Sequence, residues 1–98
     1  MQRLFAVVRS RGPAWDDSKP MEEQAGWDAH AAFMTALTAE GFVAAGGPLE
    51  DTRDVLLVVR AADPAEIRER LAADPWAPSG HLALKQVSPW RIRLGAMK

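Results

Sequence analysis

The chain has 98 residues, of which 48% are hydrophobic and 26% charged, and its formal net charge is −1. This balance is typical of one globular domain spanning residues 1–98, and the small net charge gives no electrostatic basis for binding nucleic acid. The absence of cysteine excludes disulfides, thiolate catalysis and cysteine-ligated metals. A domain of this size gains little net stability from its own core, so association with another copy would be favourable.

The N-terminal segment predicts a strand over residues 4–9, mostly apolar and bordered by arginines, followed by a turn at Gly12-Pro13. Its apolar stretch is much shorter than the roughly 20 residues of a membrane span, and it lacks the features of a signal peptide. We therefore expect a cytoplasmic protein that does not contact a membrane.

Residues 22–40 predict a long helix that ends at Gly41. One of its faces carries an apolar stripe at the spacing i, i+3, i+4 and i+7, formed by His30, Phe33, Met34 and Leu37. Because an apolar stripe faces the core, we expect His30 to point toward a sheet.

A short strand over residues 42–45 leads into Gly46-Gly47-Pro48, and a third strand follows over residues 55–60. Two adjacent glycines allow backbone angles that other residues avoid, or a very close approach to a neighbouring chain segment. The Gly46-Gly47-Pro48 segment lacks the spacing of a nucleotide-binding loop, so we interpret it as a backbone feature that could also form a cleft wall.

A second helix begins at Asp63, where an aspartate cap precedes a proline at the first helical position, and it runs to about Ala73. The last strand covers residues 82–94. Within it, Pro89 predicts a bulge or an edge position, because proline cannot donate a ladder hydrogen bond.

The element order βαββαβ predicts an α+β, ferredoxin-like fold, with a four-stranded antiparallel sheet and two helices on one face. In the first and third strands, both alternating sets of side chains are apolar. Because two helices cover only one face, the second apolar face predicts that another copy packs against it, sheet to sheet. We therefore expect a homodimer.

His30 and Asp74 are the candidate catalytic residues. An imidazole titrates near neutral pH, and a carboxylate beside it would orient the ring for general acid–base chemistry. Each residue also has a structural interpretation: His30 as a hydrogen-bonded core histidine, and Asp74 as a turn residue before Pro75. Asp28, two residues from His30, points to the other side of the helix and is interpreted as a solvated first-turn carboxylate.

Four residues are expected to border a cleft for a small-molecule substrate, namely Trp15, Gly47, Pro48 and Trp76. Trp27 and Trp90 are expected in the core or at the dimer interface, and His81 in a loop. The histidines and aspartates do not have the spacing of metal ligands, so we expect no metal and no bound cofactor.

Four phrases, in their order and spacing, resemble the YCII-related family of the dimeric α/β-barrel superfamily. They are residues 27–34 around His30, residues 40–49 with Gly46-Gly47-Pro48, Ala72-Ala73-Asp74-Pro75-Trp76, and Val87-Ser88-Pro89-Trp90. The resemblance implies a ferredoxin-like dimer, a cleft near the histidine-bearing helix, and a His/Asp pair, which here corresponds to His30 and Asp74. It also implies chemistry like that of relatives that are lyases or dehalogenating enzymes acting on ring-derived small molecules. Many members carry Arg-Pro before the histidine, where this chain has Asp28-Ala29.

Two functions are compatible with these features. In the first, the protein is a cofactor-independent enzyme of lyase or isomerase type, in which His30 moves a proton and Asp74 orients the imidazole. In the second, it is a non-catalytic binding or structural module whose dimeric cleft holds a metabolite. Contact between His30 and Asp74 beside a cavity would favour the first function.

Overall fold

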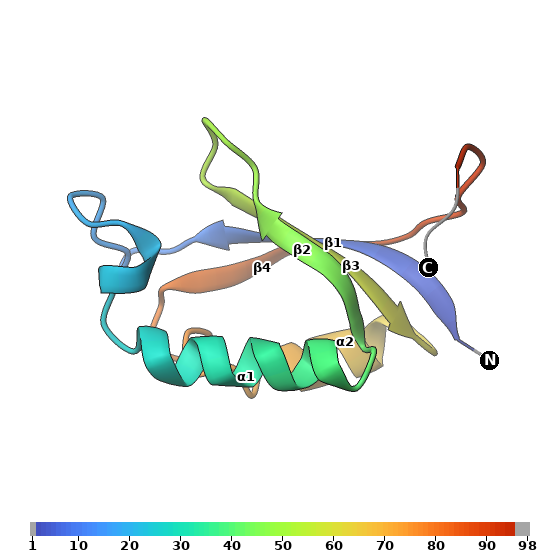
Figure 1. The fold of residues 1–98 in the computed structure, drawn as a ribbon, viewed down its shortest axis with the longest axis horizontal. Coiled ribbons are helices and arrows are strands. Elements are labelled where there is room, and N and C mark those ends of the chain that lie inside the picture. The colour runs from blue at the N-terminus through green and yellow to red at the C-terminus, as the bar shows by residue number, and fades with distance from the viewer. Residues whose placement is uncertain (1, 96–98) are drawn as a thin grey trace.

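The computed structural model describes residues 2–95 and has the predicted ferredoxin-like architecture. Its strands form one antiparallel sheet in the order β2-β3-β1-β4, and both helices lie on the same side of it (Figure 1). In chain order the elements are β1 (Arg3–Arg11), the 3-10 helix η1 (Met21–Glu23), α1 (Trp27–Ala39), β2 (Val43–Pro48), β3 (Asp54–Ala61), α2 (Pro64–Leu71) and β4 (Leu82–Pro89).

The core lies between the sheet and the helices, and the two central strands, β1 and β3, form its sheet side. On β1 the side chains of Phe5, Val7 and Arg9 alternate toward the helices and are buried. Leu37 on α1 and Ile67 on α2 pack into the same core. The predicted stripe on α1 is confirmed, since His30 and Leu37 are buried and the two residues between them on this face pack against the core.

The prediction of one helix over residues 22–40 is wrong at its start. The chain forms η1, then passes through Gly26, and α1 begins only at Trp27. Gly26 has a φ of +81°, a left-handed conformation that interrupts a right-handed helix. A Cβ atom at this position would lie 3.2 Å from Nε1 of Trp76, so the close packing of Trp76 also favours glycine.

The second strand is longer than predicted, because Gly46-Gly47-Pro48 is part of β2 rather than a segment that follows it. Gly46 pairs with Leu57, Gly47 with Leu56, and Pro48 with Val55. Pro48 is tolerated because β2 is an edge strand. The predicted close approach occurs at Gly46, where a Cβ atom would lie 2.5 Å from Cδ2 of Leu57.

Helix α2 has the predicted cap and ends near its predicted boundary. The Asp63 carboxylate accepts a hydrogen bond from the Glu66 amide at 2.9 Å. The helix ends at Leu71, and turns that include a hydrogen bond from the Asp74 amide to the Leu71 carbonyl continue the chain. Within residues 2–95, neither helix is long and apolar enough to cross a membrane.

The last strand is shorter than predicted, since β4 ends at Pro89 and residues 90–94 leave the sheet. The reason is the position of β1, which pairs with β4 and begins only at Arg3. The Trp90 amide donates a hydrogen bond to the Leu4 carbonyl, close to the first residue of β1. The residues after Trp90 therefore have no strand with which to pair. Trp90 is 40% exposed and therefore does not join the core of the protomer. The edge position predicted for Pro89 is correct, because β4 forms one edge of the sheet.

The face of the sheet opposite the helices is apolar along its two central strands. The apolar residues on this face are Leu4, Ala6 and Val8 of β1 and Leu56 and Val58 of β3, and the register places polar residues at its two ends, namely Arg60, Ser10 and Asp54. No helix among residues 2–95 covers them (Figure 1). The central part of this sheet face is therefore apolar, as the sequence predicted. Packing of a second copy against the face stays a prediction.

Candidate active site

Asp74 is positioned by a tight turn between α2 and β4. Its Oδ1 accepts a hydrogen bond from the Trp76 amide at 2.9 Å, which closes an Asx-type turn around Pro75. The backbone carbonyl of Asp74 accepts another from the Ala77 amide at 2.9 Å. The carboxylate is completely buried, so the turn fixes a charged group inside the protein.

His30 and Asp74 are in direct contact, although they are 44 residues apart in the sequence. Nδ1 of His30 lies 3.0 Å from Oδ1 and 2.8 Å from Oδ2 of Asp74. An ionised carboxylate can only accept hydrogen bonds, so Nδ1 carries the hydrogen and donates it. In the neutral imidazole this leaves the lone pair on Nε2, which has no hydrogen-bond partner among residues 2–95. The pair has the arrangement of a general base oriented by a carboxylate.

Arg9 of β1 is the third member of the cluster. Its Nη1 donates a hydrogen bond to Oδ2 of Asp74 at 2.7 Å, and only 2% of the Arg9 surface is exposed. Asp74 thus receives hydrogen bonds from a strand residue, a helix residue and its own turn. Buried ion pairs need this kind of additional hydrogen bonding, because removing two charges from water is costly.

These contacts keep Asp74 ionised. Burial by itself raises the pKa of Asp74, since it disfavours the charged form. Hydrogen bonds from His30, from the Trp76 amide and from Arg9 outweigh that effect and hold the pKa of Asp74 below its ordinary value of 3.8. The carboxylate is therefore negative at neutral pH and available to stabilise a protonated imidazole.

Trp76 holds the imidazole of His30 in place. The two rings are stacked, with centroids 3.9 Å apart and planes inclined by 9°. Nε1 of Trp76 donates to the Ala25 carbonyl at 2.8 Å, which ties the indole to the segment before α1. His81 also stacks with the indole, with ring centroids 5.3 Å apart, and Trp15 meets Trp76 in an edge arrangement with centroids 5.4 Å apart. The imidazole thus has a fixed ring plane as well as a fixed tautomer.

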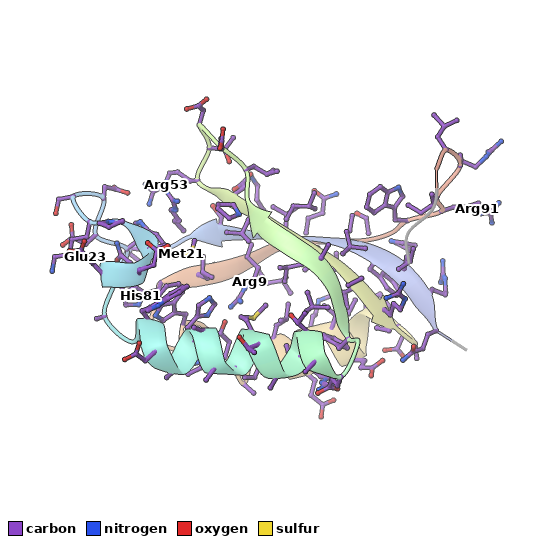
Figure 2. All side chains as sticks on the ribbon, in the orientation of Figure 1. Arg9, Met21, Glu23, Arg53, His81 and Arg91 are labelled. Carbon is purple, nitrogen blue, oxygen red and sulfur yellow. The ribbon has the colours of Figure 1, made fainter. Side chains whose placement is uncertain are left out.

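A cavity of about 400 Å³ lies beside this cluster, between α1 and the strands. This volume is in the range of small-molecule sites. Helix α1 contributes Trp27, His30, Ala31, Met34, Thr35 and Thr38 to its wall. The strands and η1 contribute Arg9, Met21, Val43, Ala45, Gly46, Gly47, Pro48, Val55, Leu57 and Leu82. In Figure 2 the labelled side chain of Arg9 lies below the sheet, and that of Met21 lies beside η1. The wall is mostly apolar, and His30 and Arg9 are its two ionisable residues.

The predicted substrate-binding residues fall into two groups. Gly47 and Pro48 line the cavity, whereas Trp15 and Trp76 are absent from its wall and pack behind the imidazole. The two tryptophans are buried because each provides a large apolar surface to the core. Asp28 is exposed, consistent with a solvated carboxylate. Trp27, expected in the core or an interface, packs against the core and also lines the cavity.

A family model for the YCII-related domain matches residues 4–91 of the chain. The chain belongs to the YCII-related family. The resemblance seen in the sequence is therefore confirmed, and the match extends from β1 to just beyond β4.

A solved structure supports the same fold for this YCII-related protein. It is 5-chloro-2-hydroxyhydroquinone dehydrochlorinase (TftG) from Burkholderia phenoliruptrix AC1100, in complex with 2,5-dihydroxybenzoquinone. The TM-score is 0.61 at 22% sequence identity, and the similarity covers 90% of this chain and 93% of the other. At this identity the likeness concerns the fold. No curated protein matches the chain.

Sequence reasoning did not identify Arg9 as part of the site. The signal was present, because Arg9 continues the alternating series Phe5, Val7 on the face of β1 that points to the core. A charged residue in a buried series needs a partner, and that partner, Asp74, lies 65 residues away. Among residues 2–95, no group of three or more histidine, aspartate or glutamate side chains is arranged to hold a metal ion.

Proposed function

We propose that this YCII-related protein is an enzyme that transfers a proton on a small organic molecule without a bound cofactor. The observation that carries the proposal is the contact between Nδ1 of His30 and the buried Asp74 carboxylate at the wall of a cavity. An oriented imidazole with a free Nε2 is suited to act as general base and then general acid. The dehydrochlorinase with the same fold is a small-molecule enzyme, which supports this class of function.

In the proposed reaction, Nε2 of His30 takes a proton from a carbon next to a carbonyl or from a ring hydroxyl. The electron pair of the broken bond stays on the substrate as an enolate or a phenolate. Asp74 stabilises the resulting imidazolium through the hydrogen bond at Nδ1. Return of the proton to another atom of the substrate gives an isomerisation. Loss of a leaving group with its bonding electron pair from the anion gives an elimination, and the imidazolium then releases its proton to the leaving group or to water.

The remaining predicted residues receive roles that follow from their positions. Gly47 and Pro48 are proposed to border the substrate, because both line the cavity. Trp76 is proposed to act on the imidazole by stacking, and Trp15 by supporting Trp76 at its edge. We also propose a homodimer formed through the apolar sheet face of β1 and β3, which is supported by the uncovered Leu4, Val8 and Leu56.

The test is exchange of carbon-bound hydrogen for deuterium, followed by proton NMR in heavy water. A panel of hydroquinones, hydroxyquinones and β-dicarbonyl compounds is incubated with the protein, and acceleration of exchange reports proton transfer before any product is known. We expect His30→Gln to lower the accelerated rate by about 10²- to 10⁴-fold. His81→Gln is the matched control, because His81 also stacks on Trp76 but does not line the cavity.

The alternative function, a non-catalytic binding module, predicts a different result. Compounds would then bind in the cavity while their exchange rates stayed equal to those in buffer, and His30→Gln would change affinity only. Exchange that survives unchanged in His30→Gln would also contradict the proposal.

A further inference from the structure

Arg9 has hydrogen-bonding capacity that the protein does not use. A guanidinium carries five N–H donors, and among residues 2–95 the Arg9 side chain makes one hydrogen bond, from Nη1 to Asp74. Nε of Arg9 is buried without any partner. Nε cannot be reached from the cavity, but Nη2 makes no hydrogen bond among residues 2–95 and keeps some accessible surface. Because Arg9 lines the cavity, Nη2 is the donor that a ligand could engage.

The charges around the cavity favour an anion. Among residues 2–95, Arg9 and His30 are the only residues of the wall that can become positive, and no carboxylate of this part of the chain lines it. Asp74, behind the wall, balances Arg9. With the neutral His30 from which the proposed reaction begins, the cluster of Arg9, Asp74 and His30 has no net charge, and it gains one positive charge next to an apolar space when His30 takes a proton. A negative oxygen on the ligand would balance that charge in a poorly solvated environment.

We propose that Arg9 is the ligand-anchoring residue of the cavity and that the substrate is a small organic anion. Its carboxylate, phenolate or enolate oxygen would accept hydrogen bonds from the guanidinium, while the acidic hydrogen lies at Nε2 of His30. Charge-assisted hydrogen bonds from arginine to such oxygens are strong and directional. The inference rests on the proposed function for the role of His30, but the binding of an anion by Arg9 is a separate property.

The mostly apolar wall limits what else the ligand can be. The groups around Arg9 and His30 include Trp27, Met34, Val43 and Leu57. These side chains suit a ring or a short hydrocarbon frame and offer little to a sugar or a phosphate ester. The chemical class is therefore an apolar, ring-sized frame that carries one negative oxygen group.

The experiment is calorimetric titration at neutral pH with pairs of compounds that differ in charge. One pair is 2,5-dihydroxybenzoquinone, which is anionic at this pH, and the neutral 2,5-dimethoxybenzoquinone. The second pair is 4-hydroxybenzoate and neutral 4-hydroxybenzamide. We expect at least one anion to bind at least tenfold more tightly than its neutral partner. The pair with the larger ratio identifies whether an enolate or a carboxylate oxygen is recognised.

Variants then assign the preference to Arg9. Arg9→Met is expected to abolish the tenfold preference, which corresponds to about 1.4 kcal/mol. Arg53→Met is the matched control, because Arg53 is an exposed arginine paired with Asp17 and does not line the cavity. If Arg9→Met does not fold, the double variant Arg9→Met/Asp74→Asn is measured in its place. The double variant removes both charges of the buried ion pair and so leaves no unpaired charge in the core.

The outcomes separate this inference from the proposed function. Retained anion binding in His30→Gln, together with loss of proton exchange, supports both. Anion binding through Arg9 without any proton exchange supports the inference and contradicts the proposed function. Equal affinity for the charged and neutral members of both pairs, no binding of either anion at millimolar concentration, or an unchanged preference in Arg9→Met would overturn the inference.

Discussion

The imidazole of His30 lies flat on the indole of Trp76, with 3.9 Å between ring centroids, while its Nδ1 donates to Asp74, two residues before Trp76. One short turn thus supplies both the carboxylate that fixes the tautomer of His30 and the surface that fixes its ring plane. The same turn is held to the segment before α1 by the hydrogen bond from Trp76 to the Ala25 carbonyl.

Truncation of Trp76 should therefore destabilise the whole domain. Trp76 is 1% exposed, and we expect Trp76→Ala to lower the free energy of unfolding by about 3–5 kcal/mol, the usual effect of removing a buried large aromatic side chain. Urea denaturation followed by circular dichroism measures the change. Trp90→Ala is the matched control at a position that is 40% exposed, and a comparable loss there would contradict the assignment.

The stability of the protein should depend on the ionisation of Asp74. The folded pKa of Asp74 is lowered, so its contribution is complete above the unfolded pKa and is lost as the pH falls through the folded pKa. We expect Asp74→Asn to lower the free energy of unfolding by about 3–5 kcal/mol at neutral pH, because Arg9 loses its buried counter-charge.

This difference between the natural protein and Asp74→Asn should shrink as the pH decreases below 3.8, the ordinary pKa of the carboxyl group. Denaturation curves from acid to neutral pH provide the measurement. Asp28→Asn, at an exposed position, serves as the control and should have little effect. A deficit for Asp74→Asn that is the same at every pH would show that the ionised carboxylate is not the source.

The two adjacent glycines of β2 should respond differently to the same substitution. In Gly46→Ala the new methyl group would lie 2.5 Å from Cδ2 of Leu57 and 3.3 Å from the backbone carbonyl oxygen of Leu56, so both a side chain and strand β3 would have to shift. We expect a loss of about 1–3 kcal/mol, typical of overpacking. In Gly47→Ala no atom of the described residues lies within 4 Å of the new atom, so the stability should change by less than about 0.5 kcal/mol. Thermal unfolding of both variants tests this contrast, and equal effects would refute it.

The proposed homodimer can be tested on the open face of the sheet. Val8 lies on this face at the centre of β1, and Val8→Lys would place a charge in the proposed interface. We expect sedimentation velocity to show a dimer for the natural protein and a monomer for the variant, since an unpaired buried charge is costly. Ala32→Lys makes the same kind of change on an exposed side of α1 and should leave the dimer intact. A monomeric natural protein would refute the proposal.

Local patterns predicted the elements of the fold and the positions of His30 and Asp74 within them, because these have local causes. The pairing of the two residues, 44 positions apart, was expected from the order of the elements and from the family resemblance. The spacing of apolar residues on α1 placed His30 toward the sheet, and the aspartate-proline turn after α2 placed Asp74 at the start of a loop. Features with distant causes were missed. The break at Gly26 depends on Trp76, the end of β4 depends on where β1 begins, and the burial of Arg9 depends on Asp74.

The Asx turn at Asp74 couples the integrity of the site to a small opening of the chain. The hydrogen bond from the Trp76 amide to Oδ1 of Asp74 is part of the turn, and the same oxygen lies 3.0 Å from Nδ1 of His30. Opening of this one turn would remove the carboxylate from both His30 and Arg9 while leaving the sheet intact. The amide hydrogen of Trp76 is thus a natural reporter of the assembled site, and its exchange with solvent measures how often the site comes apart.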